Sequence, residues 1–124
     1  MVRRHEGHLL TRALLVLIVA TFSAFAETVH ITIQYGDGRP DKIVETPYTP
    51  GASALAVLKQ VSRVETSQTG DYTFVRSIDG VRSEPGKFGW FYEIDGKSVP
   101  KTADAFPLHN ARTMHWVYKV EACY

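Results

Sequence analysis

Two Asp-Gly pairs in the second half of the sequence constrain the fold more than any other feature. Asp79-Gly80 and Asp95-Gly96 each follow a short run rich in β-branched and aromatic residues. Gly has no Cβ to clash at positive φ, and Asp tolerates the left-handed region, so each pair favours a tight turn at the end of a strand. The sequence therefore predicts a small sheet whose strands carry many aromatic rings.

The residue pattern predicts five strands, the first of them by alternation of apolar and polar residues. Residues 28–35 (TVHITIQY) place an apolar side chain at every second position, which is typical of a strand with one buried face. A second strand is predicted over residues 42–46, which Pro47 ends or confines to a sheet edge. Three later strands are predicted over residues 72–78, 88–94 and 113–120.

Residues 52–64 predict a single helix, capped at its start by Ser53 or Gly51. Apolar residues fall on one face at helical spacing, namely Ala54, Leu55, Leu58 and Val61. Residues 66–71 are predicted to be a polar link. The order of two strands, a helix and three strands is that of a β-grasp. The predicted fold class is therefore α+β, with a mixed sheet of about five strands packed on one helix.

The first 26 residues predict a signal peptide. Arginines precede an apolar run, and the Ala-Phe-Ala of residues 24–26 fits a small-x-small cleavage site. Cleavage after Ala26 leaves residues 27–124 as one domain that is exported, either to the periplasm or out of the cell. A retained anchor is the alternative, although the apolar run is shorter than the roughly 18 residues of a spanning helix.

Charge and cysteine content narrow the classes of partner. The net charge is +1 at pH 7 with both signs interspersed, whereas nucleic-acid binding calls for a basic stripe. Cys123 is the only cysteine, so it is either a free thiol or pairs with another molecule. The sequence leaves the oligomeric state open.

The ordered motifs resemble the transcobalamin C-terminal-like family, a ubiquitin-like β-grasp of cobalamin carriers and bacterial exported proteins. The resemblance covers nearly all of residues 27–124. It rests on the Gly-Asp-Gly turn at residues 36–38, the Pro-Gly before the helix, and three later segments. Those segments are FVRSIDGV at residues 74–81, GWFYEIDG at residues 89–96 and WVY at residues 116–118.

The sequence departs from the family pattern in two places. The family often has a Gly-Asp turn before its last strand, and this chain has Asn110 in that region. Asn adopts the left-handed conformation as well, so a turn is still expected. Animal cobalamin carriers also pair this domain with a large helical domain, whereas we expect a single domain from this sequence. The chain therefore binds alone, works with a partner chain, or has another ligand.

The resemblance implies a corrinoid site on the predicted fourth strand. It places Trp90, Phe91 and Tyr92 as the first candidates for ligand contact, and Phe88, Lys87 and Trp116 complete the candidate set. A flat macrocycle suits aromatic rings that stack and backbone groups that donate or accept hydrogen bonds. Because a strand alternates, Trp90 and Tyr92 share one face and Phe91 the other. The two rings either belong to the core or meet a ligand.

Metal binding and catalysis have weaker support. His109 and His115 flank the last strand and are the best metal candidates, yet no His pair has a metal-ligand spacing. Ser77, Asp79 and His115 have no motif that would assemble them into a triad. We therefore expect no enzyme activity, no catalytic residues and no resident metal.

Two hypotheses of function follow. The first is an exported, non-catalytic module that binds cobalamin or a related corrinoid at the cell envelope. The second is an envelope domain that binds a protein or a glycan through an open sheet edge or an aromatic face.

Overall fold

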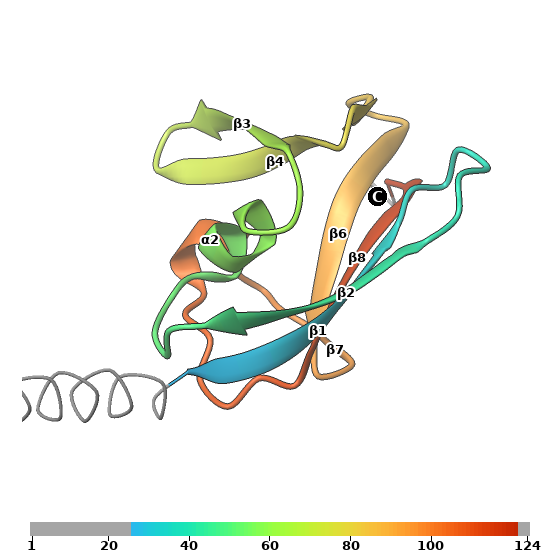
Figure 1. The fold of residues 1–124 in the computed structure, drawn as a ribbon. Coiled ribbons are helices and arrows are strands. Elements are labelled where there is room, and N and C mark those ends of the chain that lie inside the picture. Colours follow the sequence, from blue (N-terminus) through green and yellow to red (C-terminus); the bar gives the residue numbers. More distant parts are fainter. Residues whose placement is uncertain (1–25, 122–124) are drawn as a thin grey trace, which may run out of the picture.

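The computed structural model describes residues 26–121, which form two β-sheets and one short helix (Figure 1). The α-helix and strands are, in chain order, β1 (Glu27–Gln34), β2 (Lys42–Tyr48), α2 (Ala54–Lys59), β3 (Val64–Thr69), β4 (Tyr72–Ile78), β5 (Val81–Arg82), β6 (Phe88–Ile94), β7 (Lys97–Ser98) and β8 (Thr113–Val120). A 3₁₀ turn, η2, spans Ala103–Ala105. The described chain is thus mostly β, with a mixed α+β architecture.

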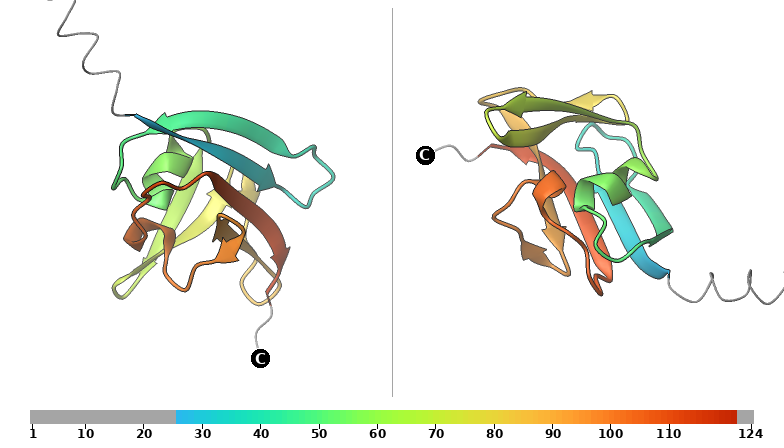
Figure 2. Two further views of the ribbon diagram at one scale, coloured as in Figure 1. Left: turned by 90° about the horizontal axis from the view of Figure 1, so that it is seen from below. Right: turned by 90° about the vertical axis from the view of Figure 1, so that its left-hand side faces the viewer.

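The larger sheet has five strands in the order β2-β1-β8-β6-β7. β1 and β8 pair in parallel, and the other neighbours pair antiparallel, so the sheet is mixed. The smaller sheet has the order β3-β4-β5 and is antiparallel throughout. Figure 2 shows that α2 and the smaller sheet lie on the same side of the larger one.

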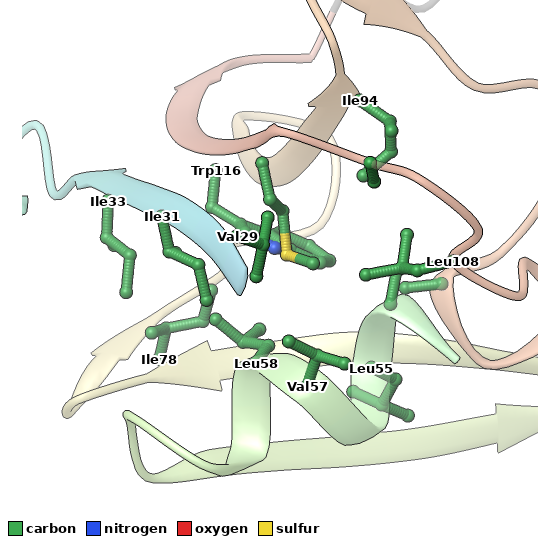
Figure 3. Packing of buried hydrophobic residues seen from close by; sticks show 14 of the residues in the cluster. Val29, Ile31, Ile33, Leu55, Val57, Leu58, Ile78, Ile94, Leu108 and Trp116 are labelled. Atoms are coloured by element: carbon green, nitrogen blue, oxygen red, sulfur yellow. The ribbon is translucent and has the colours of Figure 1, made fainter. Parts of the chain in front are cut away.

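The core fills the space between the larger sheet and the layer formed by α2 and β4 (Figure 3). The alternation predicted for the first strand is confirmed, because Val29, Ile31 and Ile33 are all fully buried. The parallel pairing brings Ile33 level with Trp116 on β8. Leu58 of α2 packs from the opposite side (Figure 3).

The predicted helix over residues 52–64 is wrong in its extent. Ser53 caps the helix as expected, with its Oγ 3.1 Å from the backbone N of Ala56, but α2 ends at Lys59. The segment after α2 is instead bound to Asp79, in the turn that follows β4. Ser62 Oγ donates a hydrogen bond to the Asp79 carboxylate (2.8 Å), and the backbone N–H of Arg63 donates another (3.0 Å). These tertiary contacts outweigh the helical periodicity.

The predicted polar link over residues 66–71 is also wrong. Residues up to Thr69 belong to β3, which pairs along its length with β4. β3 lies at the edge of the smaller sheet and its side chains are mostly exposed, so no apolar alternation marks it as a strand. The resulting hairpin removes β4 from the larger sheet, and the single predicted sheet is in fact two.

Other predictions of local structure are confirmed. β2 lies at the edge of the larger sheet, where Pro47 is tolerated. Asp79, Asp95 and Asn110 all have positive φ, between 49° and 54°. Residues 1–25 of the predicted signal peptide and Cys123 lie outside the described residues. Within residues 26–121, no helix is long and apolar enough to span a membrane.

The Asp79 carboxylate joins the two sheets. It accepts hydrogen bonds from the Tyr35 hydroxyl at the end of β1 and from Ser62 and Arg63 after α2. The ammonium of Lys42 on β2 lies 3.6 Å away. We call this set of contacts the Asp79 network. Because Asp79 sits in the turn between β4 and β5, the network ties the smaller sheet to one end of the larger sheet.

The surroundings of Asp79 favour its ionised form. Burial alone would raise the pKa of this carboxyl, but the hydrogen bonds from Tyr35, Ser62 and the Arg63 backbone, with the charge of Lys42, lower it below its usual range. The same contact raises the pKa of the Tyr35 phenol, for which burial is the largest cause and the bond to Asp79 the next.

We expect Asp79→Asn to lower the free energy of unfolding by about 1–3 kcal/mol at pH 7, because a charged acceptor of several hydrogen bonds is lost. The folded pKa lies below the unfolded value of about 3.9. The stabilisation is therefore complete above that value and is lost as the pH falls through the folded pKa. Denaturant unfolding at several pH values should show that the difference in free energy of unfolding between the wild type and the variant shrinks in acid.

Asp37→Asn is the control, because Asp37 also lies in a turn but, among residues 26–121, its carboxylate contacts only the exposed Arg39. It should change the free energy of unfolding by less than about 0.5 kcal/mol. A deficit of Asp79→Asn that persists undiminished in acid would contradict the role given to the carboxylate charge.

Candidate functional site

The free edge of β6 faces the smaller sheet. β6 pairs with β8 along its whole length, but on its other side only Glu93 and Ile94 pair with β7. Backbone groups of an antiparallel strand point to its two edges in alternation. The Phe88 backbone bonds with Glu84, on the side away from β8, so the N–H and C=O of Trp90 and Tyr92 point the same way. Within residues 26–121 no strand pairs with them there.

β4 has a free edge of its own. It pairs with β3 along its length, but on the other side only Ser77 and Ile78 pair with β5. The remaining stretch, residues 72–76, neighbours β6 without a ladder between the two strands in the described part of the chain. The Arg76 carbonyl on this edge accepts a hydrogen bond from the Ser83 backbone N–H (2.7 Å). Two strand edges therefore lie near each other, and no ladder joins them within residues 26–121.

An open groove of about 1000 Å³ occupies this region. Its walls are residues 71–76 of β4 and the preceding turn, residues 89–93 of β6, and residues 98–103. The volume lies at the upper end of the 300–1000 Å³ that is usual for small-molecule sites. We call it the β4–β6 groove.

Trp90 and Tyr92 line the groove and are half-buried. The Trp90 indole N–H donates to the Val81 carbonyl (2.9 Å), and the ring lies edge-on to Tyr35 (6.2 Å between centroids). Tyr92 stacks on Trp116 (4.9 Å, 20° between planes), and its hydroxyl donates to the Lys101 carbonyl (2.6 Å). Both rings are therefore fixed in orientation while part of each stays accessible.

The environment of Tyr92 keeps its phenol neutral. Burial is the larger cause and the nearby Asp104 carboxylate the smaller, and together they raise the pKa of Tyr92 to about 12. Asp104 itself has a lowered pKa, chiefly because of a hydrogen bond from the Thr102 hydroxyl. A second hydrogen bond to Asp104, from Thr73, ties the start of β4 to η2.

The opposite wall of the groove was not among the predicted site residues. Tyr72 and Phe74 of β4 are exposed and lie 6.3 Å apart, and the Arg76 guanidinium lies 5.8 Å from the Phe74 ring. The sequence held a signal for this wall, because three large side chains alternate along a predicted strand. It could not show that β4 leaves the larger sheet and faces β6.

Of the other candidate residues, two border the groove and two lie outside it. Phe91 is 38% exposed on the other face of β6, beneath the Lys119 ammonium at 5.0 Å, and it also borders the groove. Trp116 borders the groove as well but is only 1% exposed, so most of its ring belongs to the core. Phe88 stacks on Tyr118 (5.6 Å), and neither Phe88 nor Lys87 lines the groove.

The two histidine candidates lie apart from the groove. His115 is on the outer face of the larger sheet, with Nε2 2.8 Å from the Gln34 amide oxygen and Nδ1 3.9 Å from Glu93. His109 lies in the loop before β8 and lines a separate crevice. No cluster of three or more His, Cys, Asp or Glu side chains able to hold a metal occurs among residues 26–121.

Ser77, Asp79 and His115 do not form a catalytic triad in the structure. Ser77 is buried, Asp79 is committed to its own network, and His115 contacts Gln34 and Glu93. The groove instead offers partly accessible aromatic rings, unpaired main-chain donors and acceptors, and a balanced set of charged residues at its margins. This arrangement suits a flat, largely uncharged ligand rich in amide groups.

Comparison with solved structures shows the same fold in two other proteins. Haptocorrin, solved in complex with Cbi, matches with a TM-score of 0.66 at 10% identity over 77% of this chain. A protein from Ruminococcus gnavus ATCC 29149, named a "putative metal binding protein", matches with a TM-score of 0.60 at 18% identity over 77% of this chain. The present chain spans 25% of haptocorrin and 98% of the second protein.

The shared fold defines this chain as a small α+β domain. The chain belongs to the family described as "Domain of unknown function (DUF4430)", which matches residues 51–120. A comparison with curated proteins gives no match.

We expect Tyr92→Phe to lower the free energy of unfolding by about 1 kcal/mol at neutral pH, because the ring stays in place but the bond to Lys101 is lost. The folded pKa of about 12 exceeds the value of about 10 for a free phenol. Tyr92 therefore stabilises the fold fully below the lower value and loses this contribution as the pH rises through the higher one. Denaturant unfolding in base should show the variant losing less stability than the wild type.

Tyr72→Phe is the matched control, because the Tyr72 ring is exposed and its hydroxyl has no hydrogen bond within the described residues. It should leave both the neutral stability and the alkaline slope unchanged. Equal behaviour of the two variants would refute the role given to the hydrogen bond from Tyr92 to the Lys101 carbonyl.

Proposed function

We propose that this domain is an exported, non-catalytic module that binds cobalamin or a related corrinoid in the β4–β6 groove. The observation that carries the proposal is the combination of two fixed, partly accessible rings, Trp90 and Tyr92, with the unpaired main-chain groups of the same residues. The module acts outside the cytoplasm, in the periplasm or after secretion, and carries the β-grasp fold of the transcobalamin C-terminal-like family.

The chemistry of a corrinoid fits both features. Its macrocycle has apolar faces, which pack well on aromatic rings. Its margin carries amide arms, which exchange hydrogen bonds with backbone N–H and C=O groups. The shared fold with haptocorrin, which was solved with Cbi, supports the same ligand class.

The open shape of the groove limits the contact. One wall of aromatic residues comes from β6 and the other from β4, while the remaining side is open to solvent. A guest therefore keeps part of its surface exposed, and we expect affinity in the micromolar range, about −8 kcal/mol. Each large aromatic ring can bury about 150–250 Å² of surface, so we expect these rings to account for most of the area buried on binding.

No histidine of residues 26–121 lines the β4–β6 groove, so we expect the described domain to place no imidazole on the cobalt there. The ligand keeps its own axial groups, and its visible spectrum is expected to change little on binding. Calorimetry and quenching of Trp90 fluorescence are therefore better readouts than a shift in ligand absorbance.

We expect purified residues 27–124 to bind cyanocobalamin or dicyanocobinamide, and Phe74→Ala to weaken that binding about tenfold. The Phe74 ring is 41% exposed on the groove wall, so its removal weakens contact with the ligand more than it destabilises the fold. A tenfold loss of affinity corresponds to about 1.4 kcal/mol of binding free energy. Titration calorimetry with circular dichroism of each variant measures both quantities.

Phe88→Ala is the control, because its ring is exposed to a similar extent, 37%, but lies outside the groove lining. It should retain wild-type affinity. The proposal fails if the folded wild-type domain gives no heat and no quenching with either corrinoid at high micromolar concentration, or if the two alanine variants lose affinity equally.

The free edges of β4 and β6 favour a second candidate, an envelope domain that binds a partner strand by edge addition. In that case the domain should show no corrinoid signal, and a partner peptide should protect the amide hydrogens of Trp90 and Tyr92 from exchange. Exchange protection by a corrinoid alone would exclude it as the main role.

A further inference from the structure

A second crevice, of about 500 Å³, lies beside the β4–β6 groove and has no part in the function proposed above. It is formed by the turn between β6 and β7 and by the loop that precedes β8. Its floor is apolar, and its lining residues there are Ile94, Val99, Phe106, Pro107, Leu108 and Ala111. We call it the Lys97 crevice.

The loop wall of the crevice is held in place by hydrogen bonds from several elements. The Leu108 backbone exchanges two bonds with the residues before α2, at 2.8 Å each, to Gly51 and Ala52. The backbone N–H of Asn110 donates to the Glu27 carboxylate (2.8 Å), and that of Ala111 to the Tyr48 hydroxyl (3.0 Å). This wall is therefore formed before any ligand arrives.

The turn wall is fixed in the same way. Asp95, in the left-handed conformation, accepts hydrogen bonds from the backbone N–H groups of Arg112 (2.8 Å) and Thr113 (3.0 Å). The carboxylate charge is thus directed at the start of β8. Two preformed walls lower the entropic cost of binding a small group between them.

The margin of the crevice carries two side chains that can donate to an anion, Lys97 and His109. Both are exposed, and neither forms an ion pair within residues 26–121. Asp95 is the one carboxylate in the lining, and its contacts with two N–H groups offset part of its charge. An apolar floor with an ammonium and an imidazole at its margin suits an aromatic group that bears a phosphate.

The crevice and the groove share a wall. Ser98, Val99 and Pro100 line both of them. A ligand seated in the groove can therefore extend one arm across residues 98–100 into the crevice. Cobalamin has such an arm, a nucleotide tail with a phosphodiester and an aromatic base, whereas cobinamide lacks the nucleotide.

We propose that the Lys97 crevice is a subsite for the nucleotide tail, with Lys97 and His109 at the phosphate and the apolar floor under the base. This inference rests on the proposed function, because it assigns the ring of the same ligand to the β4–β6 groove. It adds a selectivity: the module prefers complete corrinoids to those without the tail.

The test compares cyanocobalamin with dicyanocobinamide by titration calorimetry on the wild type and on Lys97→Glu and His109→Ala. We expect the wild type to bind cyanocobalamin about threefold to tenfold more tightly, the range typical of a few exposed charge-assisted contacts. Each variant should reduce that preference and leave dicyanocobinamide affinity unchanged. Lys59→Glu, on the exposed end of α2 and outside both cavities, is the control and should keep the preference.

The outcomes separate this inference from the proposed function. Equal affinity for the two corrinoids in the wild type, or a preference that survives Lys97→Glu and His109→Ala, overturns the subsite and leaves the groove intact. Absence of any corrinoid binding overturns both. Equal loss of affinity for both ligands in the variants also overturns the subsite, because it shows an effect on the ring site or on folding.

Discussion

The attachment of the smaller sheet at two carboxylates is the constraint on which the rest of the structure depends. Asp79, at one end of β4, is bound by residues from β1, β2 and the segment after α2. Asp104 of η2, beyond the other end, accepts a hydrogen bond from Thr73. Between these points the edge of β4 is not joined to β6 by a ladder in the described chain. The β4–β6 groove, which both strands line, is the consequence.

This arrangement explains how rings can be both fixed and accessible. Trp90 and Tyr92 each donate a hydrogen bond to a main-chain carbonyl, and each ring contacts a neighbouring ring, edge-on for Trp90 and stacked for Tyr92. Their rotamers are therefore selected before binding, and little side-chain entropy remains to be lost. Phe91 lies on the opposite face under Lys119 without comparable anchoring. The alternation of β6 thus separates a preorganised face from an adaptable one.

The sequence predicted those features that depend on local geometry. Alternation located β1, and runs rich in β-branched and aromatic residues located β4, β6 and β8 closely. The aspartates of the Asp-Gly pairs adopt the positive φ that such turns favour. The end of α2 depends on contacts between Ser62, Arg63 and the distant Asp79, which no local pattern contains. β3 is a strand because β4 offers it a partner, although its own side chains are polar and exposed.

One wall of the candidate site was predictable from the sequence, and the other was not. The β6 residues of the groove stand in one conspicuous aromatic block, whereas its second wall required knowledge that β4 belongs to another sheet. Whether Trp116 belongs to the core or to a site depended on which face α2 covers, and Leu58 packs on that face (Figure 3). The Lys97 crevice joins two loops, residues 94–100 and 106–111, that no sequence periodicity connects.

The charge pattern of the groove gives a final reason for a neutral, amide-rich guest. Arg76, Lys101 and Lys119 line it together with Asp71, Glu93 and Glu121, so the two signs are matched in number. A polyanion such as nucleic acid would gain little from such a surface, since its binding draws on an excess of cations. The groove combines an apolar wall with balanced charges and open main-chain groups. Such a surface favours a ligand that stacks and exchanges hydrogen bonds but carries little net charge. Beside the groove, Lys97 and His109 border the crevice with Asp95 as the carboxylate in its lining, where an anionic arm of a ligand in the groove would reach them.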